Sequence, residues 1–190
     1  MDNIIIKQIL NHLNHKYIKQ YYLGVYSVRA FNRLNIRNFD RFSLILFISN
    51  VITTLGHWIV IIKTGKHLFF CDSFGHSPRF YKKINNPYLE FDFYFNWKLQ
   101  NDSTTICGGY AIFFIHLISA CHFDIQCFAN KIQDIFKYSQ QKKSYYNDKI
   151  IVKYIFKIYP HISKEKCKTL FCNTKFIINP KQCSNALCNT

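Results

Sequence analysis

Two apolar runs joined by a Thr-Gly pair decide the fold of this chain: HWIVIIK at residues 57–63 and KHLFFCD at residues 66–72. Both runs are rich in β-branched and aromatic residues, which are typical of strands. Thr64-Gly65 has the composition of a two-residue hairpin turn. Because both faces of the hairpin are apolar, we expect interior strands that are covered on two sides.

The expected register of this hairpin brings a histidine opposite a carboxylate. If Thr64-Gly65 is the turn, Lys63 pairs with Lys66, and the count places His57 opposite Asp72. Directly paired residues have Cβ atoms about 5 Å apart on one face of the sheet. An aspartate there can accept a hydrogen bond from the imidazole and orient the ring. A single bulge would change this register.

A nearly continuous apolar segment at residues 107–121 predicts a buried helix. Cys107 stands at its start, where free backbone N–H groups and the helix dipole lower a thiol pKa from about 8.5. Gly108-Gly109 follow, so backbone can approach a substrate closely there. Gln100 precedes the cysteine at the end of a strand, and its amide can stabilise a developing oxyanion beside the N–H of Cys107.

Each of these residues also fits an ordinary structural role. A histidine at a strand start is common, and Asp72 can simply be a turn residue. Cys107 can be a small hydrophobe in an apolar helix, and Gln100 a polar strand end. Single short motifs have a high rate of false matches, so only the joint order of the residues favours chemistry.

Periodicity predicts the remaining elements. An amphipathic helix is expected over residues 4–21, extended chain over 21–26, and a short apolar element of either type over 44–48. Residues 91–100 alternate as a third strand, in which Phe91, Phe93, Phe95, Trp97 and Leu99 share one face. Further helices are expected over 130–138 and 148–159. No repeat or linker divides the chain, which favours one domain over residues 1–190.

Composition excludes several classes of protein. The chain has 190 residues, of which 49% are hydrophobic and 18% aromatic, and disordered chains are poor in such residues. Six glycines and no long heptad pattern exclude collagen and coiled coils. The longest apolar run, residues 110–121, is too short for a membrane span. Residues 1–7 lack the features of a secretory signal. We therefore expect a non-secreted protein in a reducing compartment, with eight cysteines that serve as thiols, ligands or a nucleophile.

The chain is strongly basic, with 25 Lys and Arg against 10 Asp and Glu and a net charge of +15. An A+T-rich genome explains much of the Lys, Asn and Ile content, but not why Glu occurs only at Glu90 and Glu165. A surface that attracts nucleic acid or another polyanion is an equally good interpretation.

The joint order of the candidate residues resembles that of the adenovirus-type cysteine proteinase (adenain) family, relatives of the SUMO- and ubiquitin-like-deconjugating cysteine proteases. The matching segments are, in order, His57-Trp58, Asp72-Ser73-Phe74-Gly75, Gln100 and Cys107-Gly108-Gly109-Tyr110. The N-terminal segment Tyr21-Tyr22-Leu23-Gly24-Val25-Tyr26 is also similar to the adenoviral Tyr-Phe-Leu-Gly-Thr-Tyr. The resemblance covers about residues 21–125.

The resemblance implies an α+β fold, with a small mixed β-sheet, a central buried nucleophile helix and flanking helices. It implies a single protease domain over residues 1–190, with a catalytic core at about 21–125. A basic helical part at about 126–162 and a Cys-rich tail at about 163–190 would follow this core.

The resemblance also implies a role for each site residue. Cys107 would be the nucleophile and His57 the general base. Asp72 would orient His57, and Gln100 would form the oxyanion hole with the N–H of Cys107. In the substrate-binding channel, Trp58 would wall a narrow passage for small P1 residues and Gly108 would lie beside the substrate.

Two positions depart from the adenoviral pattern. Asp72 stands where the adenoviral enzyme usually has Glu, and Asp is the residue of the deconjugating proteases; either carboxylate can orient an imidazole. Leu89 stands where the adenoviral enzyme has the Cys that an activating peptide binds, so activation by that route is not expected.

The chemistry requires no cofactor, but DNA activates the family, and lysines after the core fit either DNA or a solvated helix face. They are Lys131, Lys137, Lys142, Lys143, Lys149, Lys153 and Lys157. Two cysteine pairs in the tail are compatible with a tetrahedral zinc site, and free thiols are the other interpretation. These pairs are Cys167 with Cys172 and Cys183 with Cys188.

The function expected from these features is a viral cysteine endopeptidase that cleaves virion precursor proteins. Its substrates would be viral precursor polypeptides, with DNA as a further partner and no membrane partner. Its location would be the virion and the infected host cell, in the nucleus or cytoplasm. The alternatives are a protease that removes a ubiquitin-like modifier and a non-catalytic basic DNA- or capsid-binding protein on this fold.

Overall fold

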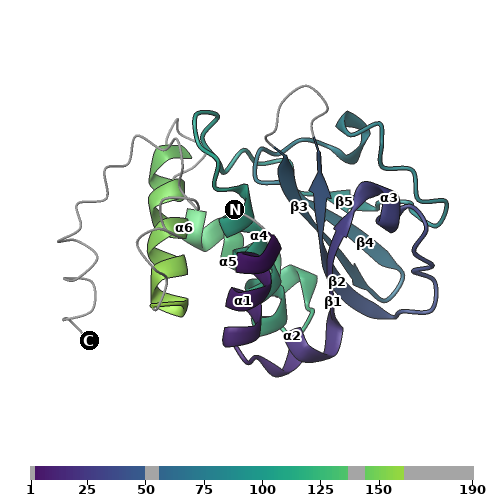
Figure 1. Cartoon of the computed structure of the whole chain (residues 1–190), viewed down its shortest axis with the longest axis horizontal. Coiled ribbons are helices and arrows are strands. Elements are labelled where there is room, and N and C mark those ends of the chain that lie inside the picture. Colours follow the sequence, from purple (N-terminus) through teal and green to yellow (C-terminus); the bar gives the residue numbers. More distant parts are fainter. Residues whose placement is uncertain (1–2, 50–55, 137–143, 161–190) are drawn as a thin grey trace.

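A mixed five-stranded sheet runs through the computed structural model, which describes residues 3–49, 56–136 and 144–160 (Figure 1). The spatial order of the strands equals their order in the chain, β1-β2-β3-β4-β5. The pairs β2–β3 and β3–β4 are antiparallel, whereas β1–β2 and β4–β5 are parallel. The strands are β1 (Tyr22–Ser27), β2 (Arg41–Ile48), β3 (His57–Thr64), β4 (His67–Cys71) and β5 (Phe93–Tyr94).

Helices cover both faces of this sheet (Figure 1). They are α1 (Asn3–His12), α2 (Lys16–Tyr21), α3 (Val28–Phe31), α4 (Cys107–Ala120), α5 (Ile125–Phe136) and α6 (Ser144–Ile158), with a 3₁₀ turn at Pro78–Phe80. The described chain is thus a mixture of helices and a mixed sheet, which is compatible with an α+β class.

Alternate side chains of β3 enter two separate apolar layers. Val60 and Ile62 pack into the layer that contains α4, while Ile59 and Ile61 pack into the layer that contains Phe31 of α3. All four of these side chains are buried. The prediction that the hairpin strands are covered on two sides is therefore confirmed.

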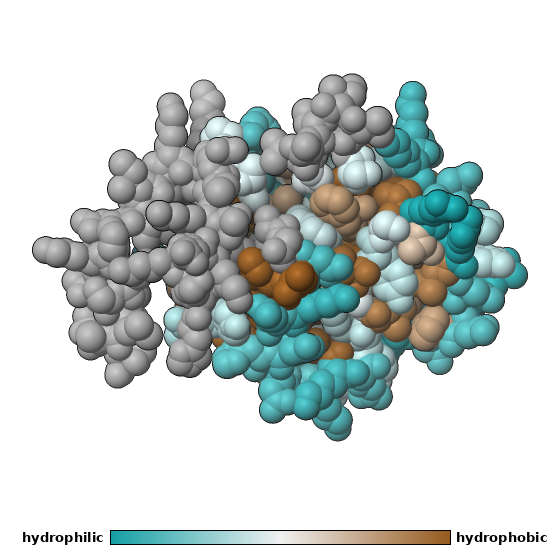
Figure 2. All heavy atoms as spheres, in the orientation of Figure 1, coloured by the Kyte–Doolittle hydropathy of each residue, from teal (hydrophilic) through white to brown (hydrophobic). Residues whose placement is uncertain are grey.

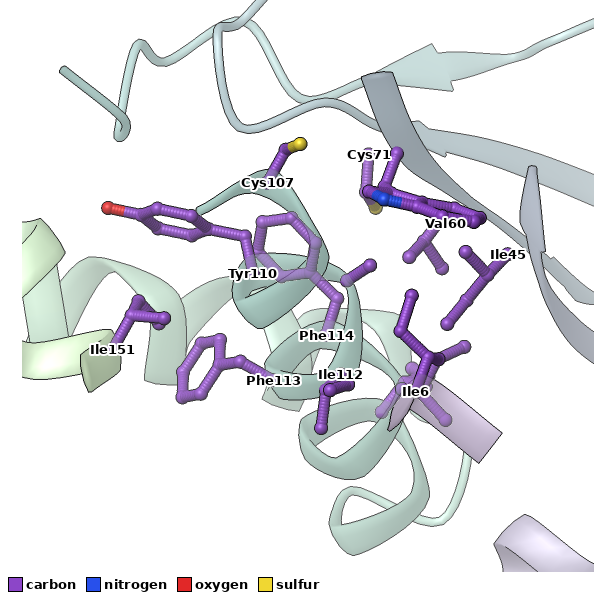
Figure 3. Close-up of a cluster of buried hydrophobic side chains, with 14 of the residues drawn as sticks. Ile6, Ile45, Val60, Cys71, Cys107, Tyr110, Ile112, Phe113, Phe114 and Ile151 are labelled. Atoms are coloured by element: carbon purple, nitrogen blue, oxygen red, sulfur yellow. The ribbon is translucent and has the colours of Figure 1, made fainter. Parts of the chain in front are cut away.

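Helix α4 lies at the centre of the larger apolar layer. Most of its residues are buried, from Cys107 at its start to Ser119 near its end. It packs against β3 and is flanked by α1, α5 and α6; Figure 3 shows Ile6 of α1 and Ile151 of α6 on either side of it. The buried helix predicted over residues 107–121 is confirmed, because a segment that is apolar all round can only be accommodated in a core.

The predicted register of the hairpin is wrong by two residues. The turn is Gly65-Lys66, so Thr64 pairs with His67, and the last pair of the ladder is Val60 with Cys71. Gly65 adopts a φ of +58°, which the turn requires and which glycine tolerates. Side chains alternate with a period of two, so a shift by two residues changes the partners and preserves the faces.

The predicted third strand over residues 91–100 is also wrong, because only Phe93–Tyr94 pair with β4. Phe93 is 53% exposed, whereas Leu99, which the pattern places on the same face, is fully buried. Side chains and loops take over the hydrogen bonds of the missing ladder. The Asp92 carboxylate accepts from the N–H of Leu68 at 2.9 Å, and the Ser73 carbonyl accepts from the N–H of Leu99 at 2.9 Å.

The predicted helices are present with different bounds. The helix expected over residues 4–21 is divided into α1 and α2, with Asn14 in the left-handed region at a φ of 48° between them. The segment 44–48 belongs to a strand, β2. Helices α5 and α6 begin at Ile125 and Ser144, several residues before the starts expected from periodicity.

Hydrophilic side chains cover most of the described surface on the face in Figure 2, with apolar patches between them. None of the helices in the described part of the chain is both long and apolar enough to span a bilayer.

Gly109 allows α6 to lie directly against the first turn of α4. A Cβ at this position would be 2.9 Å from Cγ2 of Ile151, a β-branched methyl group that cannot move away freely. We therefore expect Gly109→Ala to lower the free energy of unfolding. Overpacking costs about 1–3 kcal/mol, which exceeds the roughly 0.5–1 kcal/mol that alanine gains over glycine in a helix.

Urea denaturation of the two single variants and the double variant tests this expectation. In an Ile151→Ala background, Gly109→Ala should no longer destabilise, because the opposing methyl group is absent. A Gly109→Ala protein that is more stable than wild type would contradict the proposed close approach.

Candidate active site

A histidine and a buried aspartate meet where the central hairpin stops pairing. His57 is the first residue of β3, and Asp72 directly follows β4. Nε2 of His57 lies 2.7 Å from Oδ1 of Asp72, and the aspartate side chain is fully buried. The contact predicted from the sequence is therefore present, although the two residues are not a directly opposed pair.

Further donors hold the Asp72 carboxylate in its ionised form. The N–H of Phe74 donates to Oδ1 at 2.9 Å, and the hydroxyl of Tyr81 donates to Oδ2 at 2.6 Å. Burial raises the pKa of Asp72, but the hydrogen bond and charge of His57 and these two donors outweigh burial and lower the pKa. His76 adds a ring nitrogen 3.3 Å from Oδ2.

Two aromatic rings fix the plane of the His57 imidazole. Phe74 stacks against it with centroids 4.9 Å apart, and Tyr81 lies nearly parallel to it at 6.1 Å. The part played by Tyr81 is not visible in the sequence, since it follows a loop with no periodic pattern. The imidazole is held by a hydrogen bond at one nitrogen and by ring contacts at its faces.

Cys107 is the first residue of α4 and lies close enough to His57 for the imidazole to shift its pKa. Since Nε2 of His57 is engaged by Asp72, Nδ1 is the nitrogen that remains for the thiol. Burial raises the pKa of Cys107, but the hydrogen bond and charge of His57 and the backbone N–H of Trp58 outweigh burial and lower the pKa. Its position at a helix N-terminus acts in the same direction.

The pKa of the His57 imidazole is shifted upward, opposite to that of the Cys107 thiol. Burial lowers the pKa of His57, but the hydrogen bonds and charges of Asp72 and Cys107 outweigh burial and raise the pKa to about 9. The two shifts together favour the thiolate of Cys107 beside the imidazolium of His57. Because the folded pKa is raised, this protonation stabilises the fold fully below about 6.5, and the stabilisation is lost as the pH rises through 9.

Other cysteines of the described chain do not share this environment. Burial raises the pKa of Cys71, which lies just before Asp72. Burial and the neighbouring Cys127 raise the pKa of Cys121 to about 12. Of these three cysteines in the described residues, only Cys107 has a lowered pKa, although Cys71 is also buried.

Gln100 is fully buried and oriented through both ends of its amide. The hydroxyl of Ser73 donates to Oε1 at 2.7 Å, and Nε2 donates to the carbonyl of Thr104 at 2.8 Å. This pattern assigns the amide nitrogen and leaves its second N–H for another acceptor. The hydroxyl of Tyr110, one turn beyond Cys107, donates to the carbonyl of Leu99 at 3.2 Å, which connects the residue before Gln100 with the first turns of α4.

The loop after Asp72 aligns the segment that carries Gln100. Gly75 has a φ of +73°, and a Cβ on it would lie 2.8 Å from the carbonyl carbon of Trp97. Only glycine fits this approach of two backbones. The Ser73 carbonyl then accepts the N–H of Gln100 at 2.8 Å. The four residues Asp72-Ser73-Phe74-Gly75 thus connect His57 with Gln100.

The two residues predicted to contact substrate lie next to this centre. Trp58 follows His57, is almost completely buried, and packs on Phe47 with ring centroids 4.4 Å apart. Gly108 is buried in the first turn of α4. Gly109 was predicted to let the backbone approach a substrate, but the close contact in the structure is with Ile151 of α6.

The remaining predictions concern metals and charged partners. In the described ranges, no three His, Cys, Asp or Glu side chains are placed to hold a metal ion. The tail cysteines Cys167, Cys172, Cys183 and Cys188 lie outside the described residues, as do Lys137, Lys142 and Lys143. Leu89 packs in the apolar layer of α3. Lys149 lies over the ring of Tyr145, with its Nζ 4.5 Å from the centroid.

No protein-family model matches this sequence, and no curated protein matches it significantly. What the chain does is therefore inferred from its own side chains.

Proposed function

We propose that this chain is a cysteine endopeptidase, in which Cys107 is the nucleophile and His57 the acid–base group. The observation that carries the proposal is that Asp72 holds His57 at 2.7 Å while His57 lowers the pKa of Cys107 at the start of α4. A buried cysteine needs no lowered pKa for packing, and a nucleophile does. The finer assignment to the adenain-like fold rests on the order of these residues and on α4 as the central helix.

The arrangement of Cys107, His57 and Gln100 supports formation of an acyl-enzyme thioester. The Sγ of Cys107 attacks the scissile carbonyl carbon, and the carbonyl π electrons move onto oxygen. The backbone N–H of Cys107 and the second Nε2–H of Gln100 would stabilise the resulting oxyanion. The C–N bond then breaks, the amine leaves with the proton from His57, and a thioester remains on Cys107.

Hydrolysis of the thioester returns the enzyme to its starting state. His57 takes a proton from water, whose oxygen attacks the thioester carbon. The carboxylic acid product leaves, and the sulfur is released as the thiolate beside the imidazolium. Asp72 keeps its charge throughout and stabilises the imidazolium, with Nδ1 of the ring directed at the sulfur.

The biological substrates we propose are virion precursor polypeptides, as in the family that the sequence resembles. A protease that removes a ubiquitin-like modifier is the second candidate, and the aspartate at position 72 favours it. Incubation with a ubiquitin-like fusion and with co-expressed capsid precursors separates the two. A non-catalytic role would leave the tuned pair of His57 and Cys107 without a purpose.

Alkylation tests the activated thiolate without any knowledge of the substrate. We expect iodoacetamide at pH 6 to modify Cys107 faster than Cys127, because only a thiolate reacts and His57 maintains one at this pH. Cys127 is the matched control, since it is more exposed and lies outside the site. The measurement is peptide mass mapping over time.

The pH dependence of alkylation can contradict the proposed thiolate–imidazolium pair. Alkylation of Cys107 should persist well below pH 8.5, the ordinary pKa of a thiol being about that value. If Cys107 reacts no faster than Cys127 or Cys121 at pH 6, the thiolate–imidazolium pair is absent and the proposed function fails.

A further inference from the structure

A fully buried carboxylate lies outside the line of residues already assigned. Asp148 is in the first turns of α6 and has no exposed surface. Its Oδ1 accepts from the hydroxyl of Tyr110 at 2.9 Å, and its Oδ2 accepts from the hydroxyl of Thr104 at 2.8 Å and the N–H of Asn101 at 3.3 Å. Each of these three partners is neutral.

The partners of Asp148 all belong to the segment that carries Gln100 and Cys107. Thr104 donates its hydroxyl to Asp148, and its carbonyl accepts from Nε2 of Gln100 at 2.8 Å. Figure 3 shows the Tyr110 hydroxyl directed away from the apolar cluster, toward the side on which Ile151 of α6 lies. Asn147, next to Asp148, donates to the carbonyl of Leu99 at 3.0 Å. Asn147 and Asp148 of α6 thus hydrogen-bond directly to residues 99–104.

A packing role does not account for a charge at this position. Burying an ionised carboxylate among neutral groups is costly, and an apolar residue or an amide would pack at lower cost. The anion is, however, the strongest available acceptor for two hydroxyl groups. Both hydroxyls have a second acceptor within reach, Asn101 O for Thr104 at 2.9 Å and Leu99 O for Tyr110 at 3.2 Å. Each hydroxyl can therefore point to the Asp148 carboxylate or to a backbone carbonyl, and the charge of the carboxylate favours the first orientation.

We propose that Asp148 is a positioning residue for the oxyanion hole, and this proposal rests on the proposed function. Through Thr104 it holds the amide of Gln100 so that the second Nε2–H faces the oxygen of the carbonyl group whose carbon Cys107 attacks. Helical periodicity indicates that Asp148 faces the protein interior. Asp148 shares one helix face with three buried residues at spacings of 3, 4 and 7: Ile151, Val152 and Ile155.

The groups that face Asp148 predict how the positioning depends on pH. Burial raises the pKa of Asp148 to about 6, against the opposing effect of its hydrogen bonds. Tyr110 of α4 is the titratable group that contacts it, and burial raises the pKa of Tyr110, so it stays neutral. In the 99–104 segment, the exposed Asp102 is paired with Lys98. Protonation near pH 6 would release the hydroxyls to their second acceptors.

Steady-state cleavage of a peptide substrate by the full chain tests the proposal. We expect Asp148→Asn to lower kcat by about ten- to a hundredfold with KM changed less than twofold, since small misplacement of a reacting group costs roughly 10². Thr104→Val should act in the same way, and Thr104→Ser, which keeps the hydroxyl, should restore most of kcat. In a Gln100→Ala background, Asp148→Asn should cause no further loss.

Two further readouts separate positioning from folding. The acid limb of kcat near pH 6 should be present in wild type and absent in Asp148→Asn, while the alkylation profile of Cys107 stays the same in both. If Asp148→Asn does not fold, Thr104→Val carries the same double-variant test. An equal fold-loss in wild-type and Gln100→Ala backgrounds would overturn the proposal.

Failure of the proposed function has a different signature. If the wild-type chain cleaves no peptide, NMR of its ¹⁵N-labelled form still reports on the amide of Gln100. The Gln100 side-chain NH₂ signals should then titrate near pH 6 in wild type and not in Asp148→Asn. A signal that does not titrate in wild type would overturn the link between Asp148 and Gln100.

Discussion

Cys107→Ala should abolish peptide cleavage and leave the fold in place. Loss of a nucleophile costs on the order of 10⁶ in kcat in proteases that act through covalent intermediates. The fold should survive because a cysteine thiol is small and the side chains around α4 remain. Circular dichroism and thermal unfolding report on the fold, and a quenched peptide substrate reports on cleavage.

The same variant changes the environment of the imidazole. Without the thiolate, His57 loses one hydrogen bond and one favourable charge, so its pKa should fall from about 9 and be measurable by NMR titration. Cys127→Ala is the matched control, because this thiol lies in α5 and should leave both cleavage and the His57 pKa unchanged. Cleavage retained by Cys107→Ala would refute the assignment of the nucleophile.

Gln100→Ala should lower turnover on the order of 100-fold or more, the usual cost of removing one oxyanion donor. KM should change little, because the donor acts on charge that develops only in the transition state. The iodoacetamide reaction of Cys107 should keep its rate, since Gln100 takes no part in forming the thiolate. Turnover with a peptide and alkylation in its absence are the two measurements.

Truncation of a buried amide also affects stability. Gln100→Ala leaves the hydroxyl of Ser73 and the carbonyl of Thr104 without their partner, at a cost of about 1–3 kcal/mol each. Gln100→Glu is a second variant, which keeps the acceptor for Ser73 and replaces the donor nitrogen by an oxygen. Because that oxygen lies against the carbonyl of Thr104 and can carry a charge, urea denaturation accompanies the turnover measurement. A loss of turnover below threefold in Gln100→Glu would remove this residue from the mechanism.

The contact between His57 and Asp72 was predicted with the correct partners from an incorrect turn. The turn is Gly65-Lys66, so the ladder is displaced by two residues from the expected one. A register shift of two residues leaves every side chain on the same face of the sheet. His57 and Asp72 then lie diagonally across the two strands, a separation that the imidazole side chain can span. Displacement by one residue would have placed Asp72 on the opposite face.

The third strand shows where periodicity misleads. Alternating apolar residues from 91 to 99 match a strand, yet only two residues pair with β4. The competing hydrogen bonds come from residues remote in sequence, namely the Asp92 carboxylate on Leu68 and the carbonyl of Ser73 on Gln100. A local pattern does not include such contacts, because they depend on Leu68 of β4 and on the loop of residues 72–75 lying beside this segment.

The residues that make a buried centre reactive divide into two groups. Cys107 at the start of an apolar helix and His57 and Asp72 at the ends of two adjacent strands are local features, and the order of the amino acids alone indicated them. Tyr81 on Asp72 and Asp148 behind Gln100 follow no local signal strong enough to assign their partners. Their roles depend on which groups become buried together, and only packing in three dimensions decides which carboxylate loses water and which donors replace it.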